Sequence, residues 1–89
     1  MIKTTVTLIN KLGLHNRASA KLVATALKFQ SQCDITFDQK TINAKSILSV
    51  ITLGAIYHSQ LVLCIDGPDE EDMTKALIEL IDMKFEEAE

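Results

Sequence analysis

The sequence predicts a single two-layer α+β domain. Its 89 residues suffice for one domain, and 47% of them are hydrophobic, which is typical of a globular protein. Segments with alternating apolar residues and segments with helical apolar spacing follow one another in the order β-α-β-β-α-β-α. Because each predicted helix has one apolar face, we expect the strands to form one wall of a shared core and the helices the other. We expect residues 1–89 to form this domain without a linker or repeat.

Four short strands are predicted. Residues 2–8 alternate apolar and polar side chains, which gives this strand one mostly apolar face. Residues 34–37 and 40–43 form two more strands, and the two residues between them suit a hairpin turn. Residues 61–65 form a continuous apolar strand.

The first predicted helix covers residues 16–28. Its apolar side chains share one face, and they are Ala18, Leu22, Val23, Ala26, Leu27 and Phe29. The basic residues Arg17, Lys21 and Lys28 lie in a narrow stripe on the other face.

Two further helices are predicted downstream. Residues 47–53 lie between Ser46, a good N-cap, and Gly54, a good helix stop, although their β-branched residues also suit a strand. A turn at residues 66–68 precedes the last helix, which Asp69 can cap. The helical spacing of its apolar residues is carried by Met73, Ala76, Leu77, Leu80, Ile81 and Phe85.

The formal net charge of −3 is unevenly distributed. Residues 1–45 carry seven basic and two acidic residues, a charge of +5, whereas the remainder carries two basic and ten acidic residues, a charge of −8. A charged partner can orient such a domain, while its acidity and few aromatic residues argue against nucleic-acid binding. We expect the acidic end, residues 86–89, merely to be solvated.

Other classes of protein are disfavoured. No apolar run approaches the ~20 residues of a membrane span, and the first residues lack a signal-peptide pattern, so we expect a cytoplasmic protein without membrane insertion. Cys33 and Cys64 lie in or beside apolar runs, and we expect both to be buried, reduced thiols. No cluster has the spacing of metal ligands, so we expect no metal site.

The residues around His15 suggest phosphoryl chemistry. A helix start has unpaired backbone N–H groups, including that of Asn16, and carries the positive end of the helix dipole, which together favour a phosphate. A neutral imidazole has a nucleophilic nitrogen, and the Arg17 guanidinium matches phosphate oxygens. From spacing alone, however, a surface histidine that simply caps the helix is the more frequent case.

Residues 13–20, GLHNRASA, resemble the active-site signature of the HPr family, the histidine-containing phosphocarriers of the phosphoenolpyruvate-dependent sugar phosphotransferase system. Further stretches similar to the family are residues 43–48, 52–54 and 66–70, in family order. The resemblance spans nearly the whole chain. It implies an open-faced β-sandwich, in which three helices cover one face of a four-stranded antiparallel sheet.

The resemblance also implies a reaction. His15 would accept a phosphoryl group, at Nδ1, from a phosphorylated enzyme I and pass it to enzyme IIA-type acceptors of the sugar-specific enzyme II components, with Arg17 stabilising the phosphate. Such a protein is a stoichiometric carrier and not an enzyme, requires no cofactor, and is expected to be a monomer.

Ser46 matches the family's regulatory phosphorylation position, which would require a serine kinase, and it is also a plain helix N-cap. A short helix cannot bury all of its apolar residues, and the resemblance implies that Ile47, Leu48 and Ile51 meet partners. The basic residues expected to flank this surface are Arg17, Lys21, Lys28 and Lys45. Alternatively, they form only a solvated helix face.

The chain departs from the family at three places. Ala18 stands where many members have proline, Asn16 replaces a small or hydroxyl residue, and residues 57–60 lack a glycine. Residues 10–13 are also similar to the nitrogen-related paralogue, so a regulatory carrier is one alternative. A small-molecule-binding domain of related strand order and an inert interaction module are two others.

Overall fold

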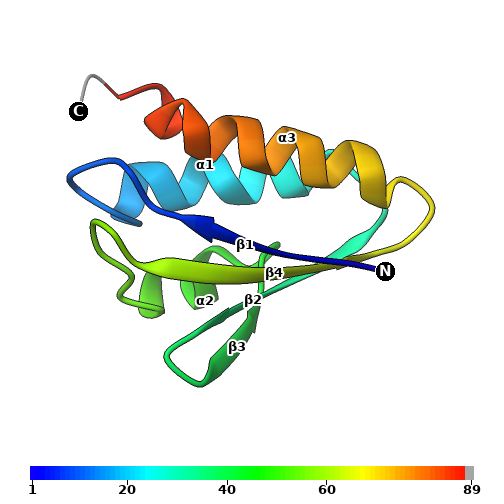
Figure 1. The fold of residues 1–89 in the computed structure, drawn as a ribbon, viewed down its shortest axis with the longest axis horizontal. Coiled ribbons are helices and arrows are strands. Elements are labelled where there is room, and N and C mark those ends of the chain that lie inside the picture. Colours follow the sequence, from blue (N-terminus) through cyan, green and yellow to red (C-terminus); the bar gives the residue numbers. More distant parts are fainter. Residues whose placement is uncertain (88–89) are drawn as a thin grey trace.

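One antiparallel sheet and three helices form the two predicted layers in the computed structural model, which describes residues 1–87 (Figure 1). The strands are β1 (Ile2–Thr7), β2 (Gln32–Phe37), β3 (Lys40–Asn43) and β4 (Gln60–Asp66), in the sheet order β1-β4-β2-β3. The helices are α1 (Asn16–Ala26), α2 (Ile47–Thr52) and α3 (Glu70–Asp82), and a short turn of 3-10 type, η1 (Lys84–Glu86), follows α3. The open-faced sandwich is therefore confirmed, with every element in the predicted order.

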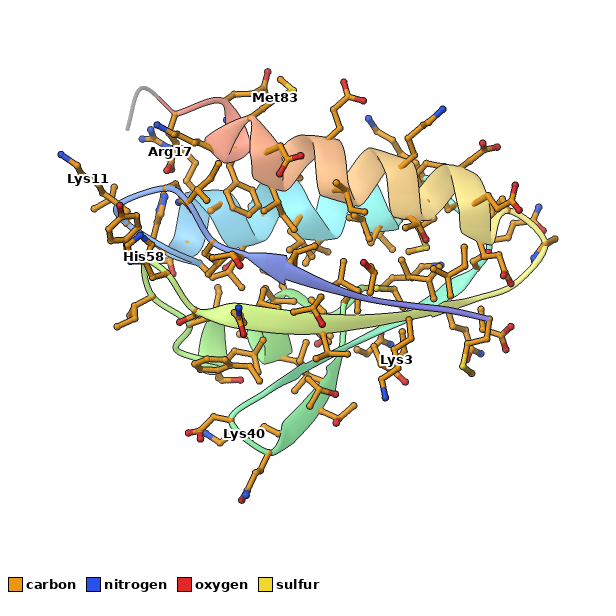
Figure 2. The ribbon with its side chains drawn as sticks, in the orientation of Figure 1. Lys3, Lys11, Arg17, Lys40, His58 and Met83 are labelled. Carbon is orange, nitrogen blue, oxygen red and sulfur yellow. The ribbon has the colours of Figure 1, made fainter. Side chains whose placement is uncertain are left out.

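The central strand, β4, organises the core. Leu63 pairs with Thr4 of β1 on one side and with Ile35 of β2 on the other, and both Leu63 and Ile35 are buried beneath the helices. Each such side chain contributes about 1.5–3 kcal/mol through burial. Lys3, next to Thr4, points away from the helices, toward the open face (Figure 2).

The alternation of side chains across the sheet separates the two cysteines. Cys33 pairs with Ile65 on the core side and is buried, whereas Cys64 pairs with Asp34 on the open side and is only half-buried. The expectation of two buried thiols is thus right for Cys33 and wrong for Cys64. Both cysteines are free.

The two-residue hairpin between β2 and β3 is confirmed. Asp38 and Gln39 have φ angles of 51° and 66°, the left-handed values that a tight hairpin needs at both central positions. These angles match the twist of the flanking strands, even though neither residue is glycine.

Helix α1 ends two residues earlier than predicted. The N–H groups of Lys28 and Phe29 bond to carbonyl oxygens only three residues back, at Thr25 and Ala26. This tightening ends the regular helix, and Leu27 is 61% exposed. The placement of Leu27 on the buried face was wrong, because the continuous helical spacing behind that prediction stops at Ala26.

The segment whose sequence suited either a helix or a strand forms helix α2. The Ser46 hydroxyl accepts a hydrogen bond from the Ser49 N–H at 3.4 Å, as an N-cap does. Gly54, with φ +69°, follows Leu53 and ends the segment in the left-handed conformation. Val50 and Leu53 are buried.

Asp69 precedes α3 but does not cap it. Its Oδ1 accepts from the Ser31 N–H at 2.8 Å and its Oδ2 from the Gln30 N–H at 2.9 Å, so it clamps the loop after α1. Glu70 accepts from the Gly67 N–H at 3.2 Å and stabilises the turn before the helix instead. The capping prediction was wrong because this loop, distant in sequence, supplies better donors.

Phe85 is fully buried, but not as part of α3. The helix ends at Asp82. Three consecutive residues after it, Lys84, Phe85 and Glu86, have left-handed φ angles between 55° and 65°. The predicted helical continuation to Phe85 was therefore wrong. The left-handed turn still inserts the ring into the core, and it turns the chain back toward the start of α1.

The Asp69 clamp predicts pH-dependent stability. Hydrogen bonds from the Ser31 hydroxyl and the Gln30 N–H hold the pKa of Asp69 below its ordinary value. The stabilisation is therefore fully present above about pH 4 and is lost as the pH falls through the lowered pKa. We expect Asp69→Asn to lower the free energy of unfolding, measured in urea at pH 7, and the deficit to shrink near pH 2.

The control for this prediction is Asp72→Asn, since Asp72 is an exposed acid in the first turn of the same helix. It should change stability much less than Asp69→Asn at pH 7. An equal deficit for Asp69→Asn at both pH values would contradict the clamp.

Candidate functional site

The loop before α1 is fixed by close backbone contacts. The Leu14 N–H donates to the carbonyl oxygen of Ala55 at 3.0 Å, and the Gly13 N–H donates to that of Asn10 at 3.1 Å. Gly13 has φ +62°, and a Cβ there would lie 2.7 Å from both Ala55 O and the Cα of Ile56. Only glycine fits this position, and it sets the path of the chain into His15.

His15 is the N-cap of α1. Its carbonyl oxygen accepts the Ser19 N–H at 2.9 Å, and its side-chain Nδ1 accepts the Arg17 N–H at 3.3 Å. Nδ1 therefore carries a lone pair and points at the positive end of the helix dipole. The side chain is 27% exposed, so a partner can reach the ring.

The other ring nitrogen contacts the C-terminal segment. His15 Nε2 hydrogen-bonds to Oε2 of Glu87, and Oε1 of Glu87 accepts a bond from Asn10 Nδ2 at 2.9 Å. The Glu87 side chain is only 12% exposed. The expectation that residues 86–89 are merely solvated was therefore wrong for Glu87, because the left-handed turn carries it inward; residues 88–89 lie outside the described residues.

Asn10 is the buried support of this arrangement. It is fully buried, and Nδ2 also donates to the carbonyl oxygen of Gly13 at 2.9 Å. Its Oδ1 has no hydrogen-bond partner among the residues that the structure describes. A reversed amide would place this oxygen against two acceptors, so the orientation with two donated bonds is fixed.

The charges around the ring are balanced. Burial alone would raise the pKa of Glu87, but the hydrogen bonds from Asn10 and His15, together with the positive charge of Arg17, hold it below its ordinary value. Glu87 is thus a carboxylate at neutral pH. The site presents an anion at Nε2 of the imidazole and the start of α1 at Nδ1.

The predicted lysines have different surroundings. Lys21 Nζ donates to the Phe85 carbonyl oxygen at 2.7 Å and lies 3.7 Å from a Glu86 oxygen. Lys45 Nζ donates to the Phe29 carbonyl oxygen at 2.7 Å, while Lys28 is exposed. Lys21 and Lys45 therefore hold loops within this chain.

Several predicted residues lie at the surface near the start of α1. Asn16 and Arg17 are exposed in its first turn, and Figure 2 shows Arg17 and His58 at the same end of the molecule. On α2, Ile47 is 38% and Leu48 is 74% exposed, and Ile51 and Ser46 are half-buried. The structure thus leaves part of the predicted apolar face of α2 uncovered.

Sequence reasoning missed Asn10 and Glu87. Asn10 lies outside every predicted helix and strand, and Glu87 lies 77 residues further along the chain. It also missed three exposed apolar residues, Leu12, Ile56 and Tyr57, which flank the contact at Gly13. Large apolar side chains within predicted loops were the available signal for these three.

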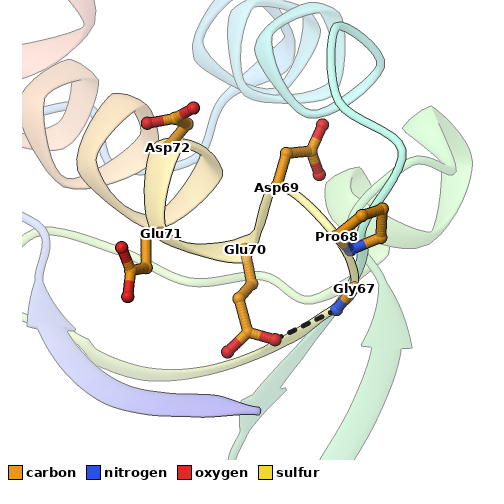
Figure 3. Close-up of a pocket in the computed structure, with 6 residues that line it drawn as sticks. All are labelled: Gly67, Pro68, Asp69, Glu70, Glu71 and Asp72. Carbon is orange, nitrogen blue, oxygen red and sulfur yellow. Dashed lines mark hydrogen bonds between the residues drawn. The ribbon is translucent and has the colours of Figure 1, made fainter.

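An acidic hollow lies at the other end of the molecule, where α3 begins (Figures 1 and 3). It is lined by Gly67, Pro68, Asp69, Glu70, Glu71 and Asp72. Its negative charge is unsuited to a phosphate. Among residues 1–87, no group of three His, Cys, Asp or Glu side chains could hold a metal ion, and no helix has the length and apolarity needed to cross a membrane.

Comparison with known proteins agrees with this geometry. Residues 2–83 match the family described as "PTS HPr component phosphorylation site". A phosphocarrier protein HPr from Cupriavidus necator is 45% identical over the full length of both chains, and one from Xylella fastidiosa is 44% identical over 98% of each. The crystal structure of HPr-C-His from Thermoanaerobacter tengcongensis superimposes with a TM-score of 0.96 at 43% identity, covering 100% of both chains.

These matches assign the chain to the small phosphoryl carriers with an open-faced sandwich fold. The chain belongs to the HPr family of the phosphotransferase system. It is a phosphocarrier of that system, and the similarity to HPr proteins favours this function over that of the nitrogen-related paralogue.

The contact at Gly13 predicts two separable effects of substitution. Gly13→Ala introduces both left-handed strain and overlap with the backbone of Ala55 and Ile56. We expect it to lower the free energy of unfolding and to move the NMR signals of the His15 ring. The matched control is Gly54→Ala, because Gly54 has φ +69° with nothing within 4 Å of a new Cβ.

Gly54→Ala should cost about 1–2 kcal/mol from strain alone and leave the His15 signals in place. If both variants lose the same stability and neither moves the ring, the close contact does not position His15.

Proposed function

We propose that His15 Nδ1 is the atom that carries the phosphoryl group. The lone pair of Nδ1 attacks the phosphorus of a phosphorylated enzyme I-type donor, a phosphorus–nitrogen bond forms, and the donor's bond to phosphorus breaks with its electron pair. The reverse chemistry passes the group to an enzyme IIA-type acceptor. The observation that supports this assignment is the bond from the Arg17 N–H to Nδ1, which leaves that nitrogen unprotonated at the helix start.

The helix start and Arg17 stabilise the added charge. The first N–H groups of α1, including that of Asn16, have no partner within the helix and can bind phosphate oxygens. The Arg17 guanidinium can hold two oxygens at once. Because the site is shallow and accessible, these contacts stabilise the phosphoryl group without enclosing it, and it stays transferable.

The partners would dock around the exposed start of α1. The uncovered apolar residues Ile47 and Leu48, with the half-buried Ile51, form one side of that surface, and the exposed Lys28 lies two residues beyond the end of α1. An apolar centre beside basic residues suits acidic partners. Lys21 and Lys45 are bonded to loops of this chain and would add positive charge to the surroundings of this surface.

The protein acts, in this proposal, as a stoichiometric carrier and not as an enzyme, since each cycle phosphorylates and regenerates His15. A single chain buries a complete core, which supports a monomer. Two free cysteines, of which Cys33 has a pKa raised to about 12 by burial, support a reducing, cytoplasmic location.

His15→Ala should abolish phosphorylation, and Arg17→Ala should slow it about ten- to hundredfold through the loss of charge-assisted hydrogen bonds. The assay is incubation with phosphoenolpyruvate and enzyme I, followed by intact mass and mapping of an acid-labile, base-stable phosphate. Both variants should stay folded by circular dichroism, because Arg17 is exposed and His15 lies at the helix start.

The control is His58→Ala, since His58 is the second histidine of the chain and stacks on Tyr57. It should be phosphorylated like the wild type. Phosphate found on His58, or retained by His15→Ala, would refute the assignment.

Ser46 is proposed as a second, regulatory phosphorylation site. Its hydroxyl is half-buried, donates to the Ser49 hydroxyl at 2.9 Å and caps α2 beside the uncovered apolar residues. A phosphate at this helix start is tolerated by the fold and adds negative charge to the docking surface. Acidic partners would then bind more weakly, and a serine kinase would have to supply the modification.

Ser46→Asp tests this role, because aspartate is also a good N-cap and adds the charge without unfolding α2. We expect slower phosphorylation of His15 by enzyme I than in Ser46→Ala, with a difference that narrows as salt screens the repulsion. Equal rates in the two variants would argue against a regulatory charge at Ser46.

A further inference from the structure

The segment after α3 is held in an unusual path. Lys84, Phe85 and Glu86 all have left-handed φ angles, which non-glycine residues rarely adopt in succession. Two anchors hold them: the Phe85 ring is fully buried, and Lys21 Nζ donates to the Phe85 carbonyl oxygen at 2.7 Å. We call residues 84–87 the C-terminal strap. This path brings the Glu87 side chain into contact with His15.

Buried Asn10 contacts Glu87 of the strap. It donates one hydrogen bond to the Gly13 carbonyl oxygen and one to Glu87 Oε1, at 2.9 Å each, while its own Oδ1 lacks a partner in the described part of the chain. A buried oxygen without a partner costs about 1–3 kcal/mol. An apolar residue would avoid that cost, so the two donated bonds are the physical reason for an asparagine here.

The contacts form one chain of hydrogen bonds. Asn10 donates to Glu87, Glu87 accepts the Nε2 proton of His15, and His15 Nδ1 accepts the Arg17 N–H. Asn10 and His15 both donate to Glu87, and the Arg17 N–H donates to His15, so reversing the tautomer of His15 would place two donors against each other at Nδ1 and two acceptors against each other at Nε2. A carboxylate that orients an imidazole in this way also fixes its tautomer.

We propose that Glu87 is a positioning residue that keeps the proton of His15 on Nε2 and so keeps Nδ1 ready for the phosphoryl group. This inference rests on the proposed role of Nδ1. When Nδ1 attacks phosphorus, the ring keeps its Nε2 proton and becomes positively charged, and the Glu87 carboxylate neutralises that charge. When the phosphoryl group leaves, the electron pair returns to Nδ1 and restores the neutral ring. No proton has to leave or enter in either direction.

Other charged side chains lie near the strap or belong to it. The positive charge of Arg17 helps to lower the pKa of Glu87, and Lys21 pairs with Glu86 of the strap at 3.7 Å. The Arg17 guanidinium therefore partly offsets the negative charge of Glu87 before phosphorylation, and it can bind phosphate oxygens afterwards.

The decisive variant is Glu87→Gln. Asn10 still donates to the side-chain oxygen of the glutamine, so the new amide N–H₂ faces His15 Nε2. A donor at that position favours a proton on Nδ1 and reverses the tautomer. The matched control is Glu86→Gln, which removes a neighbouring, exposed carboxylate that does not contact the ring.

Two measurements test the proposal. Nitrogen-15 NMR of the neutral His15 ring should show the Nε2–H form predominating in the wild type and in Glu86→Gln, and the Nδ1–H form increasing in Glu87→Gln. Phosphorylation by enzyme I should slow about tenfold or more in Glu87→Gln alone. A purely structural role for Glu87 would change the unfolding midpoint without changing the tautomer.

Each outcome is informative. A wild-type ring mainly in the Nδ1–H form would overturn the proposal even if Glu87→Gln failed to fold. So would an unchanged tautomer and rate in Glu87→Gln, or equal losses in Glu86→Gln. The tautomer is read from unphosphorylated protein, so failure of the proposed phosphorylation of His15 would be seen separately, as a wild-type protein that accepts no phosphate.

Discussion

The close contact of Gly13 with the backbone of Ala55 and Ile56 is the constraint on which the site depends. It allows the loop after β1 to pass tightly over the segment before β4, and the Leu14 N–H then bonds to Ala55. This fixes the point at which α1 begins and makes His15, rather than a neighbour, its N-cap. The nitrogen that faces the helix dipole is therefore determined by packing outside the helix.

Phosphoryl transfer in both directions requires a site that binds phosphate only moderately. Here the positive contributions come from a helix dipole, backbone N–H groups and one exposed guanidinium, all open to water. The negative contribution is the carboxylate of Glu87, which lies on the opposite side of the ring. This separation stabilises a charged ring without placing a carboxylate directly against the incoming phosphate.

Most of the fold could be predicted from local pattern. The alternation in β1, the helical spacing in α1 and α3 and the cap at Ser46 each depend on residues close together in the sequence. The predictions at Leu27 and Phe85 failed because helical periodicity does not show where a helix stops. Asp69 was misassigned for a related reason, since the donors it binds lie on another loop.

The candidate site was predictable only where its residues lie close together in the sequence. His15 and Arg17 lie two positions apart and form a recognisable motif, whereas Asn10 and Glu87 meet only because the chain turns left-handed after α3. A short run of acids near the end of a chain looks like a solvated surface, and no local pattern distinguishes Glu87 from Glu86. The part of the site that depends on tertiary contacts was therefore missed.

The positions of the two terminal segments affect how this protein can be handled. The amino group of Met1 pairs with Glu70 at 3.0 Å, at the opposite end of the sheet from His15, whereas Glu87 contacts the His15 ring (Figure 1). A purification tag or fluorescent fusion joined behind Glu89 begins two residues from a contact of the imidazole. Attachment ahead of Met1 removes the ion pairs of its amino group with Asp66 and Glu70 and leaves the contacts of the His15 ring in place.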